Sequence, residues 1–114
     1  MKLPNGSRAI VDIAKIRDYC LNPLHPRGRH KARVFAAALG LTRADADLLR
    51  AHLLDAAAGA EATPGAMDEF GVRYTIDSVL EHSGLSAPIR SAWLIPANEK
   101  TPRLTTCFVI MKST

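Results

Sequence analysis

The chain has little of what metal, redox and cofactor sites need. Its 114 residues include two cysteines, Cys20 and Cys107, which lie far apart and belong to no CxxC pair. This spacing disfavours a zinc site, and the apolar or aromatic neighbours of both residues predict two buried thiols. HExxH, P-loop and GxGxxG motifs and a paired acidic cluster are also missing, so the sequence predicts neither a bound metal nor a cofactor.

Long apolar runs are missing as well. No segment approaches the length of a membrane span, and the first residues, Met1 to Gly6, have neither the apolar stretch nor the cleavage site of a signal peptide. We therefore expect no contact with a membrane. A cytoplasmic location is expected by default, with secretion only if the chain is part of a larger exported protein.

The composition is that of an ordinary globular protein, with 47% apolar and 23% charged residues. The length suits one domain with one core over residues 1–114, with a basic helical half over about 1–59 and a β half over about 66–112. The formal net charge is +4. Lysine and arginine gather in the first third of the chain, and aspartate and glutamate gather in its middle. This polarity is typical either of a surface for an anionic partner or of a solvated surface with a chance asymmetry.

Apolar spacing predicts helices first and strands second. The helices are expected over about 13–21, 28–39 and 43–58, with an N-cap at Asp12, a C-cap at Gly40 and a capping box of Thr42 and Asp45. After a small-residue connection at 60–65 the period changes to two, and strands are expected over 72–80, 89–95 and 103–110. The order predicts an α+β fold, with about three N-terminal helices packed on one face of an antiparallel β-meander of three to four strands.

The most informative segment is the loop and helix start between Asn22 and Phe35. Two prolines and a glycine make the loop rigid, and within nine positions it carries His25, Arg27, Arg29, His30, Lys31 and Arg33, with no carboxylate between them. Free backbone N–H groups and the helix dipole at such a junction favour an anion, above all a phosphate backbone. The alternative is that these cations are solvated and that Lys31 lies along the edge of the core.

Some of these residue types can cleave RNA without a metal. The reaction needs a base for the 2′-hydroxyl, an acid for the leaving 5′-oxygen and cations on the phosphate. A histidine in a rigid loop, His25, is a natural general acid or base, although it is equally expected to brace the loop by bonding backbone groups. Ser91 and Thr106 lie in the middle of predicted strands, where a hydroxyl is ordinary unless it faces the cationic helix end.

Several short motifs resemble one bacterial family. They are LNPxHPxGxxKAxxF at Leu21–Phe35, LG at Leu39–Gly40, FGxxY at Phe70–Tyr74, RSxWxI at Arg90–Ile95 and PRLxT at Pro102–Thr106. In this order they resemble the domain-of-unknown-function family 6883 over most of residues 12–110. Ser91 stands where many members carry threonine, which keeps the hydroxyl. Phe108 stands where tyrosine is frequent, so no catalytic role is expected there. Some members resemble toxin domains of the barnase, EndoU, colicin and RelE type, which implies helices before an antiparallel sheet and a ribonuclease-like activity.

These observations favour a toxin-like, metal-independent endoribonuclease or RNA-binding domain. His25 would be the general acid or base. Lys31 and Arg103 would hold the phosphate, and Ser91 and Thr106 would orient the scissile group. The residues expected to bind nucleic acid are Arg27, Arg29, His30 and Arg33. RNA and an acidic antitoxin or immunity-like protein are the expected partners. The alternative is a non-catalytic interaction domain that docks an acidic partner protein through its basic loop and helix.

Overall fold

Helices fill the first half of the chain and strands fill the second. The computed structural model describes residues 1–111. The helical elements are η1 (Gly6–Arg8), α1 (Ile13–Lys15), the π-helical turn η2 (Ile16–Cys20), α2 (Arg29–Leu39), η3 (Arg43–Asp45) and α3 (Ala46–Gly59). The strands are β1 (Ala62–Asp68), β2 (Gly71–His82), β3 (Leu85–Pro96) and β4 (Arg103–Val109). This order confirms the predicted α+β fold.

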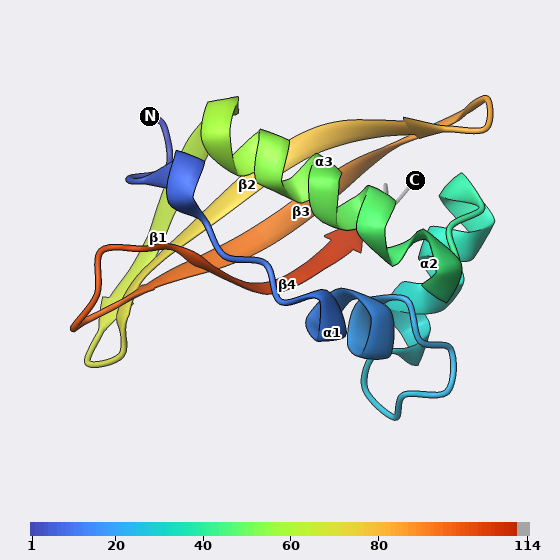
Figure 1. Ribbon diagram of the computed structural model, residues 1–114, viewed down its shortest axis with the longest axis horizontal. Coiled ribbons are helices and arrows are strands. Elements are labelled where there is room, and N and C mark those ends of the chain that lie inside the picture. Colours follow the sequence, from blue (N-terminus) through green and yellow to red (C-terminus); the bar gives the residue numbers. More distant parts are fainter. Residues whose placement is uncertain (112–114) are drawn as a thin grey trace.

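The four strands form an antiparallel meander in the order β1-β2-β3-β4. In Figure 1, α3 runs across one face of the sheet, and α1 and α2 gather at one end of the molecule. Ser83 and Gly84 join β2 to β3 with φ angles of 52° and 78°. Both residues therefore lie in the left-handed region that a tight two-residue hairpin requires.

Strand β1 departs from the expected small-residue connection at 60–65. Its sequence, ATPGAMD, contains a proline and a glycine and has low β-propensity. It is nevertheless an edge strand, because it pairs with β2 from Ala62, opposite Ile76, to Asp68, opposite Gly71. Proline and glycine are tolerated at an edge, and the register shifts just after Pro64. The neighbouring strand, rather than local propensity, makes this segment a strand.

The expected caps are confirmed. The Asp12 carboxylate accepts the backbone N–H of Ala14 at 2.9 Å and so begins α1. Gly40 ends α2 in the left-handed region, at φ 67°. In the capping box before α3, the Asp45 carboxylate accepts the backbone N–H of Thr42 at 2.8 Å. Each cap satisfies a helix-end group that would otherwise lack a partner.

The helix predicted over 13–21 has an unexpected geometry. After one α turn it widens into the π turn η2, where the Leu21 N–H donates to the Ile16 carbonyl, five residues back, at 2.9 Å. Ile16 and Cys20 are still buried, as the apolar spacing predicted. Both predicted thiols, Cys20 and Cys107, are free and buried.

The core lies between the helices and the sheet. Phe35 of α2, Leu53 of α3 and Trp93 of β3 are among its largest fully buried side chains. Burying such a side chain contributes about 1.5–3 kcal/mol. This packing fixes α2 and α3 against the sheet.

The segment before α1 lies along the free edge of β4. The Ile10 N–H donates to Pro102 at 2.9 Å, and the Ile10 carbonyl accepts from Leu104 at 3.0 Å, which makes a short parallel bridge. At Asp12 the chain turns into α1. Lys15 of α1 and Tyr19 of η2 then line a depression together with Thr105 of β4.

Candidate functional site

A depression of about 370 Å³ lies where the helical segment meets β4. It is lined by Lys15 of α1, Tyr19 of η2, His25 and Arg27 of the following loop, and Thr105 of β4. Two backbone irregularities meet here, the π turn η2 and a β-bulge at Thr105. π turns and β-bulges redirect side chains and occur often at functional sites.

His25 is held by the loop that carries it. Its Nδ1 accepts the backbone N–H groups of Arg27 and Gly28, each at 3.0 Å. The neutral ring therefore carries its proton on Nε2, which can donate a hydrogen bond but cannot accept a proton. The loop-bracing role of His25 is thus present in the structure. It leaves Nε2–H as the part of the ring that is available to a ligand.

Tyr19 connects the loop to α2. Its ring meets the ring of His25 edge to face, with centroids 4.9 Å apart and planes at 88°. The Lys31 ammonium donates to the Tyr19 hydroxyl at 3.0 Å and lies 5.1 Å from the centroid of its ring. Gly28 is required beside it, because a Cβ at Gly28 would come within 2.0 Å of the Tyr19 carbonyl oxygen. Tyr19, His25 and Lys31 therefore form one contact network.

The surroundings of this network are cationic. Among the residues that line the depression, Lys15 and Arg27 are cations and none is a carboxylate. The first turn of α2 carries Arg29, His30 and Lys31 without an acidic residue. Cations at the positive end of a helix dipole are unfavourable by about 0.3–1 kcal/mol each. Helix stability does not explain this charge, whereas an anion beside the helix start would.

Buried thiols lie behind Lys31. The hydrogen bond with the Cys107 thiol lowers the pKa of Cys20 to about 7, and the charge of Lys31 acts in the same direction. The hydrogen bond with Cys20, together with burial, raises the pKa of Cys107 well above its usual value. Because neither side chain reaches the surface, the two thiols belong to the core.

Thr106 follows the bulge residue in β4. Its hydroxyl is buried and has no hydrogen-bond partner within residues 1–111. A buried hydroxyl without a partner costs about 1–3 kcal/mol. The orienting role predicted for Thr106 stays a prediction.

Two other predicted site residues lie apart from the network. Ser91 is completely buried in the core, where its hydroxyl donates to the Ile76 carbonyl at 3.3 Å and accepts the Trp93 indole N–H at 2.9 Å. A substrate in the depression cannot reach it in this structure. Arg103 is paired with Glu99 at 3.0 Å and lines an adjoining depression of about 250 Å³. The two depressions share Lys15 and Thr105, so Arg103 borders the site through that neighbour.

The remaining predicted residues are distributed around α2. Arg29, His30 and Arg33 are exposed, and His30 and Lys31 line a separate depression next to Phe108. Arg27 lines the main depression, and its role in binding phosphate stays a prediction.

Lys15, Tyr19 and Thr105 were not predicted as site residues. The spacing of four residues between Lys15 and Tyr19 was the available signal, because it puts them on one helix face. Over residues 1–111, no cluster of three potential metal ligands occurs. No helix within that range has both the length and the apolar character needed to cross a bilayer.

Comparisons with known proteins give a fold and a family. A chain from a solved structure titled "Contact-dependent growth inhibition toxin - immunity protein complex from Klebsiella pneumoniae 342" has a similar fold, with a TM-score of 0.68 at 14% sequence identity. The similarity covers 90% of this chain and 100% of that chain. No curated protein matches the sequence. The model of the family described as "Domain of unknown function (DUF6883)" matches residues 2–111. The match spans nearly the whole sequence, and the chain therefore belongs to the DUF6883 family.

Proposed function

We propose that the depression binds the phosphate backbone of RNA and that the chain is a toxin-like, metal-independent endoribonuclease. The observation that carries this proposal is the contact network of Tyr19, His25 and Lys31, of which Tyr19 and His25 line a depression to which Lys15 and Arg27 add positive charge. Preorganised donors and cations around a transferring phosphoryl group are a main source of catalysis in such sites. The similarity to a chain of a toxin–immunity complex supports a toxin-like or immunity-type protein, and the cationic depression favours the toxin-like alternative.

Tyr19 is the proposed acid. Its oxygen already accepts from Lys31, so its own proton is available for donation. When the 2′-hydroxyl oxygen attacks phosphorus, the bond from phosphorus to the 5′-oxygen breaks and the 2′-hydroxyl proton leaves to solvent. The Tyr19 proton passes to the leaving 5′-oxygen. The Lys31 ammonium stabilises the resulting phenolate. The products are a 2′,3′-cyclic phosphate and a free 5′-hydroxyl.

His25 acts as a donor in this proposal. With Nδ1 occupied by the Arg27 and Gly28 N–H groups, Nε2–H donates to a non-bridging phosphate oxygen. Lys15 and Arg27 neutralise charge that develops on the phosphate. This arrangement makes His25 a hydrogen-bond donor to the phosphate rather than the general acid or base predicted for it.

The test is cleavage of RNA in the presence of EDTA, with the products separated on a gel. Discrete fragments that end in a 2′,3′-cyclic phosphate are expected, and DNA should remain intact because it lacks the 2′-hydroxyl. Tyr19→Phe keeps the ring but removes the proton, so the rate should fall about 10²–10⁴-fold. Lys31→Met should also slow cleavage, whereas Lys100→Met, which removes an exposed cation elsewhere, should not.

A second variant separates bracing from chemistry at His25. His25→Asn offers an amide oxygen near the position of Nδ1 for the Arg27 and Gly28 N–H groups, but has no group at the position of Nε2. We expect a small fall in the unfolding midpoint, because the ring contact with Tyr19 is lost, and a large loss of rate. Full activity in both Tyr19→Phe and His25→Asn, or equal activity on DNA, would refute the mechanism.

A non-catalytic interaction domain is the second candidate function. In this case the basic loop and α2 would dock an acidic partner protein, as an antitoxin or immunity-like protein would require. The segment from Tyr19 to Ala44 contains no aspartate or glutamate, which favours an acidic partner. Absence of RNA cleavage by the wild-type chain, together with salt-sensitive binding of an acidic protein, would favour this candidate.

A further inference from the structure

A further depression lies beside the start of the loop that follows η2. It has a volume of about 340 Å³ and is formed between the start of this loop, α2 and the connection to α3. The residues that line it include Leu21, Ala32, Arg33, Ala36, Leu41 and Arg43. We call it the apolar groove. None of its lining residues lines the depression that holds Tyr19 and His25.

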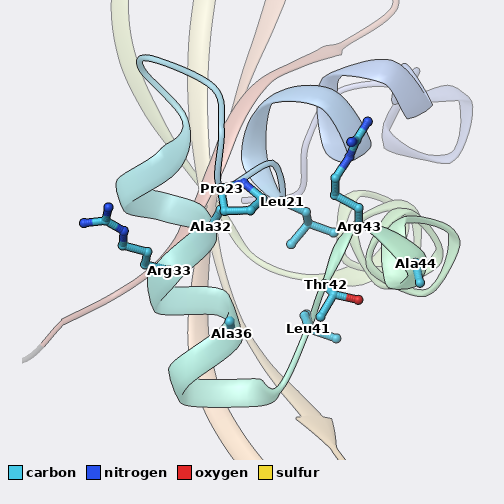
Figure 2. Close-up of a pocket in the computed structure, with 9 residues that line it drawn as sticks. All are labelled: Leu21, Pro23, Ala32, Arg33, Ala36, Leu41, Thr42, Arg43 and Ala44. Carbon is cyan, nitrogen blue, oxygen red and sulfur yellow. The ribbon is translucent and has the colours of Figure 1, made fainter.

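The chemistry of the groove is apolar inside and cationic at the rim. The buried side chains of Leu21 and Leu41 lie at its base, next to the small side chains of α2. In Figure 2, the guanidinium groups of Arg33 and Arg43 extend outward on opposite sides of these apolar side chains. Next to the groove, the side chain of Leu24 is 85% exposed. An apolar group that entered the groove would therefore contact apolar side chains, and the arginines would surround it with positive charge.

Few carboxylates of the described residues pair with the arginines at the rim of the groove. Arg43 pairs with Asp18 at 2.8 Å, but Arg33 makes no ion pair with any residue from 1 to 111. Arg29, one helical turn before Arg33, also makes none in this range. Like charges four residues apart destabilise a helix by about 0.2–0.5 kcal/mol. Every residue that lines the groove comes from the carboxylate-free segment between Tyr19 and Ala44. Within residues 1–111 no carboxylate pairs with Arg29 or Arg33, so both are available to carboxylates of another molecule.

We propose that the apolar groove is a docking site for an acidic protein, which inserts an aliphatic or aromatic side chain between α2 and residues 41–44 and sets carboxylates against Arg29 and Arg33. This inference deepens the second candidate function, since it rests on an acidic partner, and it holds whether or not the chain also cleaves RNA. A protein fits better than RNA because no lining residue is aromatic, so an inserted base would find no ring on which to stack. Buried apolar anchors surrounded by charged contacts are the usual arrangement of a protein interface.

Two substitutions on α2 form a matched pair for the test. Ala36 and Ala37 are adjacent and exposed, but Ala36 lines the groove and Ala37 does not. Ala36→Trp should fill the groove, whereas Ala37→Trp introduces the same side chain on another helix face. Both replacements have the same intrinsic helix cost, so a difference between them reports on the groove. Circular dichroism would establish that both variants are folded.

The probe is a phage-displayed library of random 12-residue peptides selected on the full chain. We expect enriched peptides to carry an apolar or aromatic residue flanked by aspartate or glutamate. Synthetic copies, measured by fluorescence anisotropy, should bind Ala36→Trp at least tenfold more weakly than wild type and should bind Ala37→Trp normally. Binding should weaken in Arg33→Ala and at high salt.

Each other outcome contradicts the proposal in a distinct way. If acidic peptides bind both tryptophan variants equally, the partner chemistry stands and the groove is the wrong surface. If no peptide is enriched, or if the enriched peptides are neutral or basic, the acidic partner and the groove are both refuted. If Ala36→Trp instead weakens binding of a 12-nucleotide RNA, the groove belongs to nucleic acid. RNA cleavage should be equal in both variants, so the catalytic proposal is tested separately.

Discussion

Ser91 gives the sharpest test of the difference between a catalytic and a structural hydroxyl. Ser91→Ala removes the acceptor of the buried Trp93 indole N–H and the donor to the Ile76 carbonyl. A buried donor left without a partner costs about 1–3 kcal/mol, so the free energy of unfolding should fall by about that amount. Urea unfolding followed by far-UV circular dichroism would measure it. RNA cleavage under native conditions should be unchanged.

A double-mutant cycle assigns this cost to the indole. Trp93→Phe removes the N–H as well as part of a fully buried ring and will itself destabilise the protein. In the Trp93→Phe background, Ser91→Ala loses only the longer bond to Ile76 and should cost about 0.5–1 kcal/mol. The coupling energy should therefore be about 1–2 kcal/mol. A coupling near zero, or cleavage abolished in Ser91→Ala without a change in stability, would refute the structural assignment.

Two further predictions concern stability. Gly28→Ala should destabilise the chain by about 1–3 kcal/mol in urea unfolding, because its Cβ would overlap the Tyr19 carbonyl. Gly59→Ala, whose Cβ meets no atom within 4 Å, is the control, and equal effects would refute the close approach. Burial lowers the pKa of His52. The unfolded state therefore binds more protons, and stability should fall as the pH drops from about 7 to 5. His52→Gln should reduce this loss, and an unchanged pH dependence would contradict it.

The elements that were predicted correctly are those that depend on contacts between residues close together in the sequence. Helices begin or end at Asp12, Gly40 and the Thr42–Asp45 box through contacts within a few residues. The residue types at these positions are therefore sufficient to predict the caps. Strand β1 was missed because its pairing with β2 decides its structure. The π turn was missed because burial of Ile16 and Cys20 satisfies an α-helical pattern equally well. The spacing of apolar residues indicates which side chains are buried. One extra residue in a helical turn hardly changes that spacing, so it does not distinguish a π turn from an α turn.

Only part of the candidate site could be predicted, namely the part that is contiguous in the sequence. The basic loop is contiguous in sequence, so His25, Arg27 and Lys31 could be selected from composition. Tyr19 lies within the helix predicted over 13–21, and its contacts with His25 and Lys31 depend on how the π turn orients its ring. For Ser91, a hydroxyl in the middle of a strand has the same sequence signature whether it faces a ligand or supports a core tryptophan. The tautomer of His25 likewise depends on where the backbone N–H groups of the loop point.

The way in which the loop is fixed bears on what it can bind. His25 Nδ1 holds two backbone N–H groups, Gly28 lies against the Tyr19 carbonyl, and Lys31 is tied to the Tyr19 hydroxyl. These contacts need no ligand, so Lys31 and the His25 ring are positioned before an anion arrives. An anion that enters such a site loses little free energy to ordering the protein, and a phosphate gains more from fixed donors than from mobile ones. By contrast, Arg29 and Arg33 are exposed and tied to no carboxylate within residues 1–111, which suits a surface that must adapt to a partner protein. The rigid depression and the adaptable rim therefore favour two different ligands, a phosphate at Tyr19 and a protein at the apolar groove.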